Sequence, residues 1–251
     1  MMSRWALVGL IVVSCAGLLR AQDALDTQPP SPDGDVAQPL TPYGTALLAY
    51  KIGKYDEART AIDAAEKAKP GDVPTEILKA KILTEQHDFA DGEKVLRSVL
   101  TPTGPPEVEL ALGDLLLRKR SFDRATKYYT LALAAKPNDP DIILKLVYAR
   151  IGVSDLVGAG QYTSHLTPLD PKNPYDDHAS YYFAKAALAQ ATGNLQGAED
   201  NIQAARTNYG ITVTNRYLKT YLEFFSTPEK GADSDQTPAP LVKPAPSGAN
   251  P

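Results

Sequence analysis

A short pattern recurs along this chain at a nearly constant interval, and that recurrence restricts the possible folds more than any other feature. In each copy an aromatic residue or a leucine is followed three positions later by a small residue. The small residues are Ala58, Gly92, Ala125, Ala159 and Ala198, whose numbers rise by 34, 33, 34 and then 39 from one copy to the next. A fixed period in this range indicates stacked supersecondary units. The alternative is an ordinary helical bundle whose periodicity is accidental.

The pattern within a copy is helical. In the third copy, apolar and small residues recur with helical spacing on both sides of a short polar turn: Leu112, Gly113 and Leu116 before it, and Phe122, Ala125, Tyr129 and Ala132 after it. This spacing predicts two helices joined by a turn. Asn138 or Asp139 is expected to cap the next helix, with Pro140 near its first position, where a missing N–H costs little.

These residues resemble the tetratricopeptide repeat, a helix–turn–helix unit of about 34 residues. The third copy, about 106–139, carries the motif in register, with Pro137 as its last motif residue. Three other copies, at 39–72, 140–173 and about 179–212, carry part of the motif. The second copy, 73–106, is the weakest because Glu76 and Lys79 do not fit the pattern, which leaves the register of its first helix open. Gly210 replaces the terminal proline of the fifth copy.

The resemblance implies an all-α fold, a right-handed superhelical α-solenoid of about five helix hairpins. Small residues suit the crossing of the two helices in each hairpin, because a larger side chain would separate the backbones at a cost of about 1–3 kcal/mol. After the fifth copy, apolar residues again have helical spacing: Tyr217, Leu218, Tyr221, Leu222 and Phe225. We expect a terminal capping helix whose aromatic residues belong to the core.

The two ends of the chain differ from its middle. Residues 1–21 place an apolar run between Arg4 and Arg20, typical of a secretory signal. Cleavage after Ala21 and lipidation at Cys15, which ends a loose lipobox, both remain open. Proline-rich stretches follow at 22–41 and close the chain at 227–251. We expect a signal peptide (1–21), a disordered linker (22–41), a helical solenoid (42–226) and a disordered tail (227–251). Both routes predict an exported protein, periplasmic, associated with the outer membrane or secreted, whose only membrane contact is the signal or a lipid anchor.

The composition argues against several classes of function. Cys15 is the only cysteine, so the exported part has no thiol nucleophile and no disulfide. Without residues 1–21 the chain has 24 basic and 30 acidic residues and no basic run, which argues against a nucleic acid partner. We find no phosphate-binding loop and no hydrolase or metalloprotease motif.

The histidines do not form a predicted metal site. His87 falls in a turn, His165 on the second helix of the fourth copy, and His178 follows Asp176 and Asp177. Adjacent residues rarely converge on one ion, and the two aspartates also suit a helix N-terminus. We therefore predict no catalytic residue, no metal ligand, no cofactor and no enzymatic activity.

The resemblance also implies that the first helix of each copy faces a concave surface. The predicted groove residues are Tyr43, Leu47, Ile77, Lys81, Leu110, Asp114, Leu144, Tyr148 and Phe183. An apolar and aromatic stripe of this kind suits a peptide or an amphipathic helix of a partner protein. The alternatives are that these side chains pack between helices or are covered by the protein's own tail. The function predicted is a non-enzymatic interaction scaffold of the cell envelope. The alternative is a membrane-tethered lipoprotein that helps to assemble an outer-membrane, pilus or polysaccharide-export complex.

Overall fold

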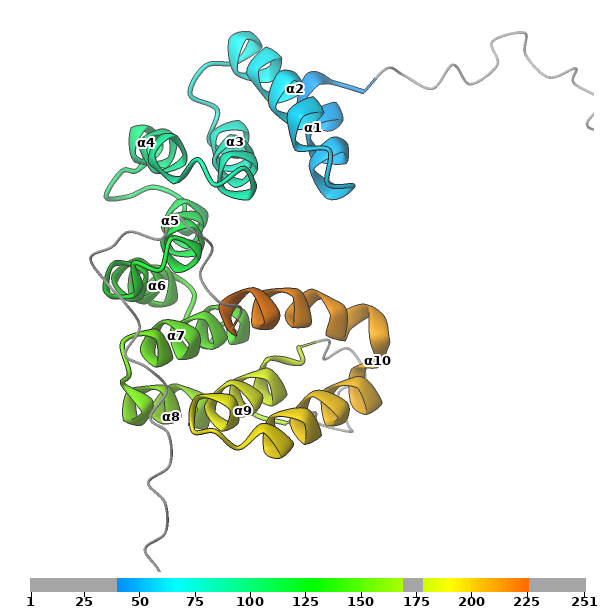
Figure 1. The fold of residues 1–251 in the computed structure, drawn as a ribbon. Coiled ribbons are helices and arrows are strands. Elements are labelled where there is room, and N and C mark those ends of the chain that lie inside the picture. Colours follow the sequence, from blue (N-terminus) through cyan, green and yellow to red (C-terminus); the bar gives the residue numbers. More distant parts are fainter. Residues whose placement is uncertain (1–39, 169–177, 226–251) are drawn as a thin grey trace, which may run out of the picture. The chain divides into compact units, whose positions relative to one another are not determined.

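The computed structural model describes residues 40–168 and 178–225, and every regular element within them is an α-helix (Figure 1). The expected signal peptide, Cys15, most of the linker, the tail and the pair Asp176 and Asp177 lie outside the described residues. The helices are α1 (Pro42–Lys51), α2 (Tyr55–Ala68), α3 (Val73–Glu85), α4 (Phe89–Val99), α5 (Pro106–Arg118), α6 (Phe122–Ala135), α7 (Pro140–Gly152), α8 (Leu156–Ser164), α9 (Ser180–Ala191) and α10 (Leu195–Phe225).

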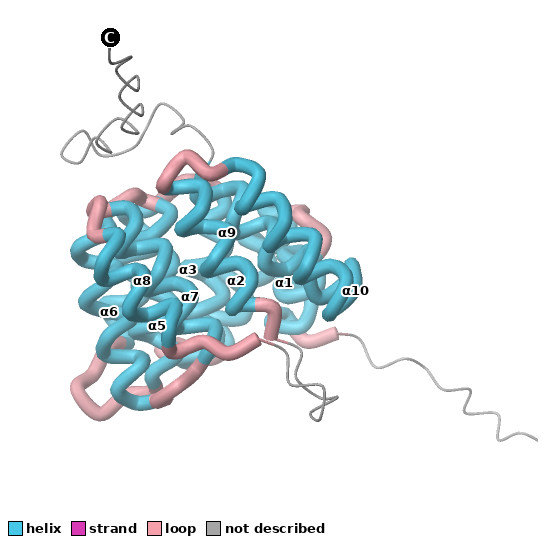
Figure 2. Tube along the Cα trace, turned by 90° about the horizontal axis from the view of Figure 1, so that it is seen from below, coloured by secondary structure: helices cyan, strands magenta, loops and turns pink. Residues whose placement is uncertain are grey.

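The helices pair in sequence order. Close contacts join α1 to α2, α3 to α4, α5 to α6, α7 to α8 and α9 to α10, and each hairpin also packs on the next. The odd-numbered helices contact one another along the stack, from α1 through α3, α5 and α7 to α9. Figure 2 shows the pink loops that join consecutive helices. The predicted all-α solenoid of about five hairpins is confirmed.

The turn inside each hairpin repeats the same backbone conformation. One residue per turn has a positive φ of 61–81°: Gly53, His87, Arg120, Ser154 and Gly193. The numbers of these five residues rise by 34, 33, 34 and 39, as those of the small residues do. The left-handed conformation costs a non-glycine residue about 1–2 kcal/mol, and three of the five turns accept this cost.

Capping side chains begin α1, α3 and α7, and the cap of α7 was predicted from the sequence. Asp139 accepts hydrogen bonds from the backbone N–H groups of Asp141 and Ile142, and α7 begins at Pro140. Asp72 similarly caps α3 by accepting from Thr75. The α9 helix begins at Ser180. His165 follows the last residue of α8 instead of lying on that helix, because α8 ends early at Ser164.

The five small residues of the sequence pattern all lie in buried positions. Ala58, Ala125 and Ala159 have no exposed surface, and Ala198 is almost fully buried. A Cβ atom on the buried Gly92 would lie 2.8 Å from Cδ1 of Leu115, so α4 approaches α5 too closely for even an alanine without adjustment. These positions let successive helices pack at short range.

The second copy keeps the common register despite its two misfit residues. Lys79 extends from α3 to α2, where its ammonium lies 3.0 Å from Asp63 and 2.6 Å from Glu66. Glu76 is buried, and its burial and the nearby Glu66 raise the pKa of its carboxyl above the ordinary value. Both residues therefore depart from the pattern in residue type while the helix is unchanged.

The last helix bends at Gly210, whose φ of 75° and ψ of 173° are not helical. We call residues 211–225, after the bend, the return helix. Figure 1 shows the yellow arm of α10 along α9 and the orange return helix beside α7. Tyr217, Tyr221 and Phe224 are its buried aromatic residues, so the predicted capping role agrees with the structure. Leu222 is 56% exposed, because the buried face follows positions i, i+4 and i+7 from Tyr217.

Candidate binding groove

Six of the nine predicted groove residues line one groove on the first three hairpins. They are Tyr43 and Leu47 of α1, Ile77 and Lys81 of α3, and Leu110 and Asp114 of α5. Other lining residues include Tyr50, Val73 and Leu78, so most of the surface is apolar. The cavity has a volume of about 460 Å³, within the range of sites that hold a ligand segment. We call it the open groove.

The other three predicted residues do not reach an open surface. Leu144, Tyr148 and Phe183 are buried, with 4%, 0% and 0% of their surface exposed. The ring of Tyr148 lies 5.1 Å from that of Phe224, and Phe183 stacks on Tyr217 with ring centroids 5.5 Å apart. The prediction that these three residues line an accessible groove is therefore corrected. The return helix covers Tyr148 and Phe183. Packing between helices was one of the alternatives left open by the sequence.

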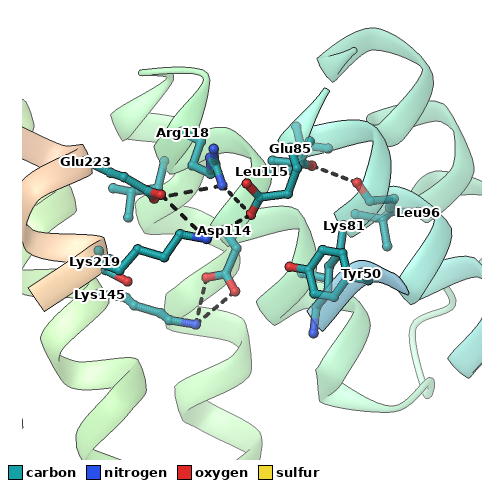
Figure 3. Close-up of a pocket in the computed structure, with 15 residues that line it drawn as sticks. Tyr50, Lys81, Glu85, Leu96, Asp114, Leu115, Arg118, Lys145, Lys219 and Glu223 are labelled. Atoms are coloured by element: carbon teal, nitrogen blue, oxygen red, sulfur yellow. Dashed lines mark hydrogen bonds and ion pairs between the residues drawn. The ribbon is translucent and has the colours of Figure 1, made fainter. Parts of the chain in front are cut away.

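A pocket lined by charged side chains lies next to the open groove and shares Tyr50, Lys81, Ala111 and Asp114 with it (Figure 3). Its volume is about 270 Å³. Glu85 at the end of α3 accepts a hydrogen bond of 2.7 Å from Arg118 and lies 3.5 Å from the ammonium of Lys219. We call this the charged pocket. Figure 3 shows Lys219 reaching into it from the return helix, opposite side chains of α3 and α5.

Two further ion pairs complete the charged pocket. Arg118 lies 3.8 Å from Glu223 of the return helix, so both ends of the Glu85–Arg118 pair contact that helix. On α5, Asp114 lies 2.8 Å from the ammonium of Lys145 and accepts a hydrogen bond of 2.9 Å from the hydroxyl of Tyr129. The charged pocket thus joins the return helix to the edge of the open groove by side-chain contacts.

The acidic side chains around these pockets also affect the tyrosines. Burial, Glu85 and Tyr55 raise the pKa of the Tyr50 hydroxyl to about 12. Burial and Asp114 raise the pKa of Tyr129 well above its ordinary value. Both hydroxyls are therefore neutral at physiological pH, and that of Tyr129 donates a hydrogen bond to Asp114.

No metal site is present among the described residues, where no three His, Cys, Asp or Glu side chains are arranged to hold an ion. His178 belongs to a different arrangement. Its Nδ1 atom lies 3.5 Å from the hydroxyl of Tyr217 and 3.8 Å from Asp141, and that hydroxyl donates to Asp141 at 2.7 Å. His178 thus helps to seat the return helix against the start of α7.

Four residues of these pockets were not predicted from the sequence: Tyr50, Glu85, Arg118 and Lys219. Tyr50 follows Leu47 by three positions on α1, so continuing the groove stripe by one more turn would have found it. Glu85 and Arg118 end their helices and are separated by one repeat interval, so they occupy equivalent positions in successive copies. Lys219 had no such signal, because its position depends on the direction of the return helix.

The sequence profile described as "Tetratricopeptide repeat" matches residues 43–73 and 77–140, which hold most of the first three hairpins. These hairpins are tetratricopeptide repeats. Beyond residue 140 the tetratricopeptide repeat array continues with the same turn conformation at Ser154 and Gly193. Tetratricopeptide repeats bind protein partners, and the open groove lies on the first helices of three of them.

Solved tetratricopeptide repeat structures share this fold at low sequence identity. A thermophilic tetratricopeptide repeat protein from Thermus thermophilus, TTC0263, is 17% identical and has a TM-score of 0.56, with 72% of this chain and 97% of that chain covered. PilW, described as a widely conserved type IV pilus biogenesis factor, is 20% identical with a TM-score of 0.53, and 69% of this chain and 80% of that chain are covered. At these identities the likeness shows the fold alone.

The curated relatives are much longer proteins. Anaphase-promoting complex subunit 7 from Mus musculus is 30% identical over 106 residues, which are 42% of this chain and 19% of the relative. Protein O-mannosyl-transferase TMTC1 from Homo sapiens is 26% identical over 115 residues, 45% of this chain and 13% of the relative. This chain thus spans less than a fifth of their length. None of the helices in 40–168 and 178–225 combines the length and apolarity that crossing a membrane requires.

Proposed function

We propose that this protein is a non-enzymatic scaffold that binds an apolar, helix-forming segment of a partner protein in the open groove. The observation that carries the proposal is the convergence of six first-helix residues from three successive repeats on one cavity of about 460 Å³. The return helix covers the equivalent surface of the later repeats and leaves this one uncovered. A concave apolar surface of this size is typical of an interaction site.

The charges at the rim favour a particular partner segment. Glu107 is paired with Lys136 at 2.6 Å, and Asp114 is paired with Lys145. Lys81 is exposed and pairs with no acidic side chain of the described residues. We therefore expect the partner helix to place apolar side chains, spaced by three and four positions, against α1, α3 and α5, with a carboxylate facing Lys81.

The groove can be tested by comparing two surfaces of the same helix. The double substitution Leu47→Ser and Ile77→Ser removes apolar side chains from the open groove. The control Leu48→Ser changes a residue of α1 that is 51% exposed and does not line the groove. After in-cell crosslinking, partners captured by the wild-type protein should fall at least tenfold with the double variant and stay unchanged with the control. Equal capture by all three proteins would exclude the open groove as the binding site.

The proposed place of action is the cell envelope, and it rests on the sequence. The apolar run between Arg4 and Arg20 supports export through a signal peptide cleaved after Ala21. Mass spectrometry of the mature N-terminus tests this point directly. A first residue at Gln22 supports the exported scaffold, whereas an intact Met1 would contradict export.

A second candidate function is a membrane-tethered assembly factor of an envelope complex. Two observations favour it: the stretch 12–15 resembles a lipobox ending at Cys15, and the fold is similar to that of PilW. The same mass spectrum separates the candidates, because this one requires Cys15 to carry a lipid. Substituting Cys15→Ser should then release the protein from the membrane fraction, and unchanged membrane association would exclude the lipid tether.

A further inference from the structure

The surface beneath the return helix is aromatic and belongs to several repeats. Phe122 begins α6, Tyr148 lies on α7 and Phe183 lies on α9, and all three rings are buried. We call them the covered aromatic surface. Phe224 of the return helix contacts the first two, with ring centroids 5.8 and 5.1 Å apart. Tyr217 stacks on Phe183, so the helix contacts this surface through aromatic residues at positions i, i+4 and i+7.

Two features of the return helix favour its release from the repeats while the chain stays connected through Gly210. Gly210 is exposed, and a Cβ atom placed on it would meet no atom within 4 Å. The bend is therefore open on the side where a side chain of residue 210 would stand. At the other end the holding contacts are partly solvated, since the side chains of Lys219 and Glu223 are 58% and 37% exposed. Partly solvated ion pairs of this kind stabilise by only about 0.2–1 kcal/mol each, whereas reversing their charges replaces attraction by repulsion.

The fit between the return helix and its seat leaves one polar group unsatisfied. The hydroxyl of Tyr148 is fully buried and has no hydrogen-bond partner among the described residues. Burial raises the pKa of this hydroxyl far above its ordinary range, and the neighbouring Tyr221 and Tyr217 add to the effect. The hydroxyl is therefore a donor without an acceptor. A helix that brought an acceptor to this point would bind the same surface better than the protein's own helix does.

We propose that the covered aromatic surface is a second protein-binding site, which the return helix occupies as an internal ligand. Its partner is an amphipathic helix of another protein, with aromatic residues at i, i+4 and i+7 and a carboxylate or amide oxygen facing Tyr148. The site is distinct from the open groove and does not depend on the function proposed for that groove. Because the internal helix competes, the apparent affinity is the intrinsic affinity multiplied by the unoccupied fraction of the site. Occupancy of about 99% therefore weakens binding about a hundredfold.

The proposal can be tested on the full chain with a synthetic probe. The probe is a fluorescent peptide with the sequence of residues 209–226. The double substitution Lys219→Glu and Glu223→Lys places like charges opposite Glu85 and Arg118, so it weakens the internal helix while keeping its aromatic residues and the net charge. We expect this variant to bind the peptide at least tenfold more tightly than the wild-type protein. Leu222→Ala, on the exposed face of the same helix, should bind like the wild type.

Two controls make the result specific. A probe in which Tyr217, Tyr221 and Phe224 are replaced by alanine should not bind, and the groove variant Leu47→Ser with Ile77→Ser should bind the normal probe like the wild type. Amide hydrogen exchange in 211–225 of the full chain should accelerate when the normal probe is bound. Equal probe affinity of the wild-type and charge-reversed proteins, or unchanged protection of 211–225, would overturn the proposal. Formation of a dimer by exchange of return helices would also overturn it, in favour of a second copy as the ligand.

Discussion

The close approach of α5 and α6 at Gly113 is open to a single-residue test. A Cβ atom on Gly113 would lie 2.5 and 2.6 Å from the Cε1 and Cδ1 atoms of Tyr129. Carbon atoms in favourable contact are about 3.5–4.0 Å apart, so the ring would have to move by about 1 Å. The ring has little freedom to move, because it is fully buried and its hydroxyl donates a hydrogen bond to Asp114. Gly113→Ala should therefore strain the contact between the two helices.

The expected magnitude follows from two opposing effects. Overpacking in a core typically costs about 1–3 kcal/mol, whereas alanine is favoured over glycine in a helix by up to about 1 kcal/mol. We expect a net loss of about 1–2 kcal/mol in the free energy of unfolding, measured by urea denaturation. In a domain of this size the midpoint of thermal unfolding should fall by about 2–8 °C.

A matched control separates the contact from the helix preference. Gly160 lies inside α8, and a Cβ atom there would meet no atom within 4 Å. Gly160→Ala should therefore stabilise the protein by about 0.5–1 kcal/mol. In a background of Tyr129→Leu, which removes the ring, Gly113→Ala should lose most of its cost. If Gly113→Ala is as stable as Gly160→Ala, the argument that small residues set the spacing of the repeats is refuted.

Three further substitutions test the bend, the covered surface and a charge pair. Gly210→Ala should destabilise the protein by about 1–3 kcal/mol in thermal unfolding, because the φ and ψ of Gly210 belong to a region open almost only to glycine; an unchanged midpoint would mean that the bend is not as described. Tyr148→Phe removes the unsatisfied hydroxyl and should be neutral or stabilising by up to about 1 kcal/mol, so a clear loss of stability would reveal a hidden partner. Burial raises the pKa of Glu93, but the hydrogen bonds from Arg97 and Arg124 together lower this pKa by more than burial raises it. The net pKa is therefore below 4.5. The stability that Glu93 adds is thus present above its ordinary pKa of 4.5 and lost as the pH falls through its lowered pKa. Glu93→Gln should therefore cost about 1–3 kcal/mol at neutral pH and progressively less in acid, and a pH-independent cost would contradict this.

The repeat fold was predictable because the same pattern of small and apolar residues recurs in each copy. The small residues at Ala58, Gly92, Ala125, Ala159 and Ala198 mark the buried crossings wherever the local helix sequence varies. Even the second copy keeps its register, because a single helix cannot change register without losing its contacts to both neighbouring hairpins. The α-helices and their order were therefore fixed by a pattern that five copies share.

The candidate site was only partly predictable, because one part of it depends on a segment outside the repeat. Helical spacing indicated that 212–227 forms a helix with an apolar face, but spacing does not tell against which surface that face packs. Gly210 looked like the end of the fifth repeat, whereas its φ and ψ turn the chain back over α9 and α7. Tyr148 and Phe183 thus have the spacing of groove residues and the burial of core residues.

The uneven capping of the array also determines how a partner segment can lie in the open groove. At the C-terminal side the return helix places Lys219 and Glu223 across the charged pocket, next to Lys81 and Asp114 of the groove. At the N-terminal side Tyr43 and Leu47 of α1 line the open groove. We therefore expect a partner helix to lie with its apolar side chains toward α1. Its polar end should face the charged pocket, because an apolar end would leave these charges without water or a partner.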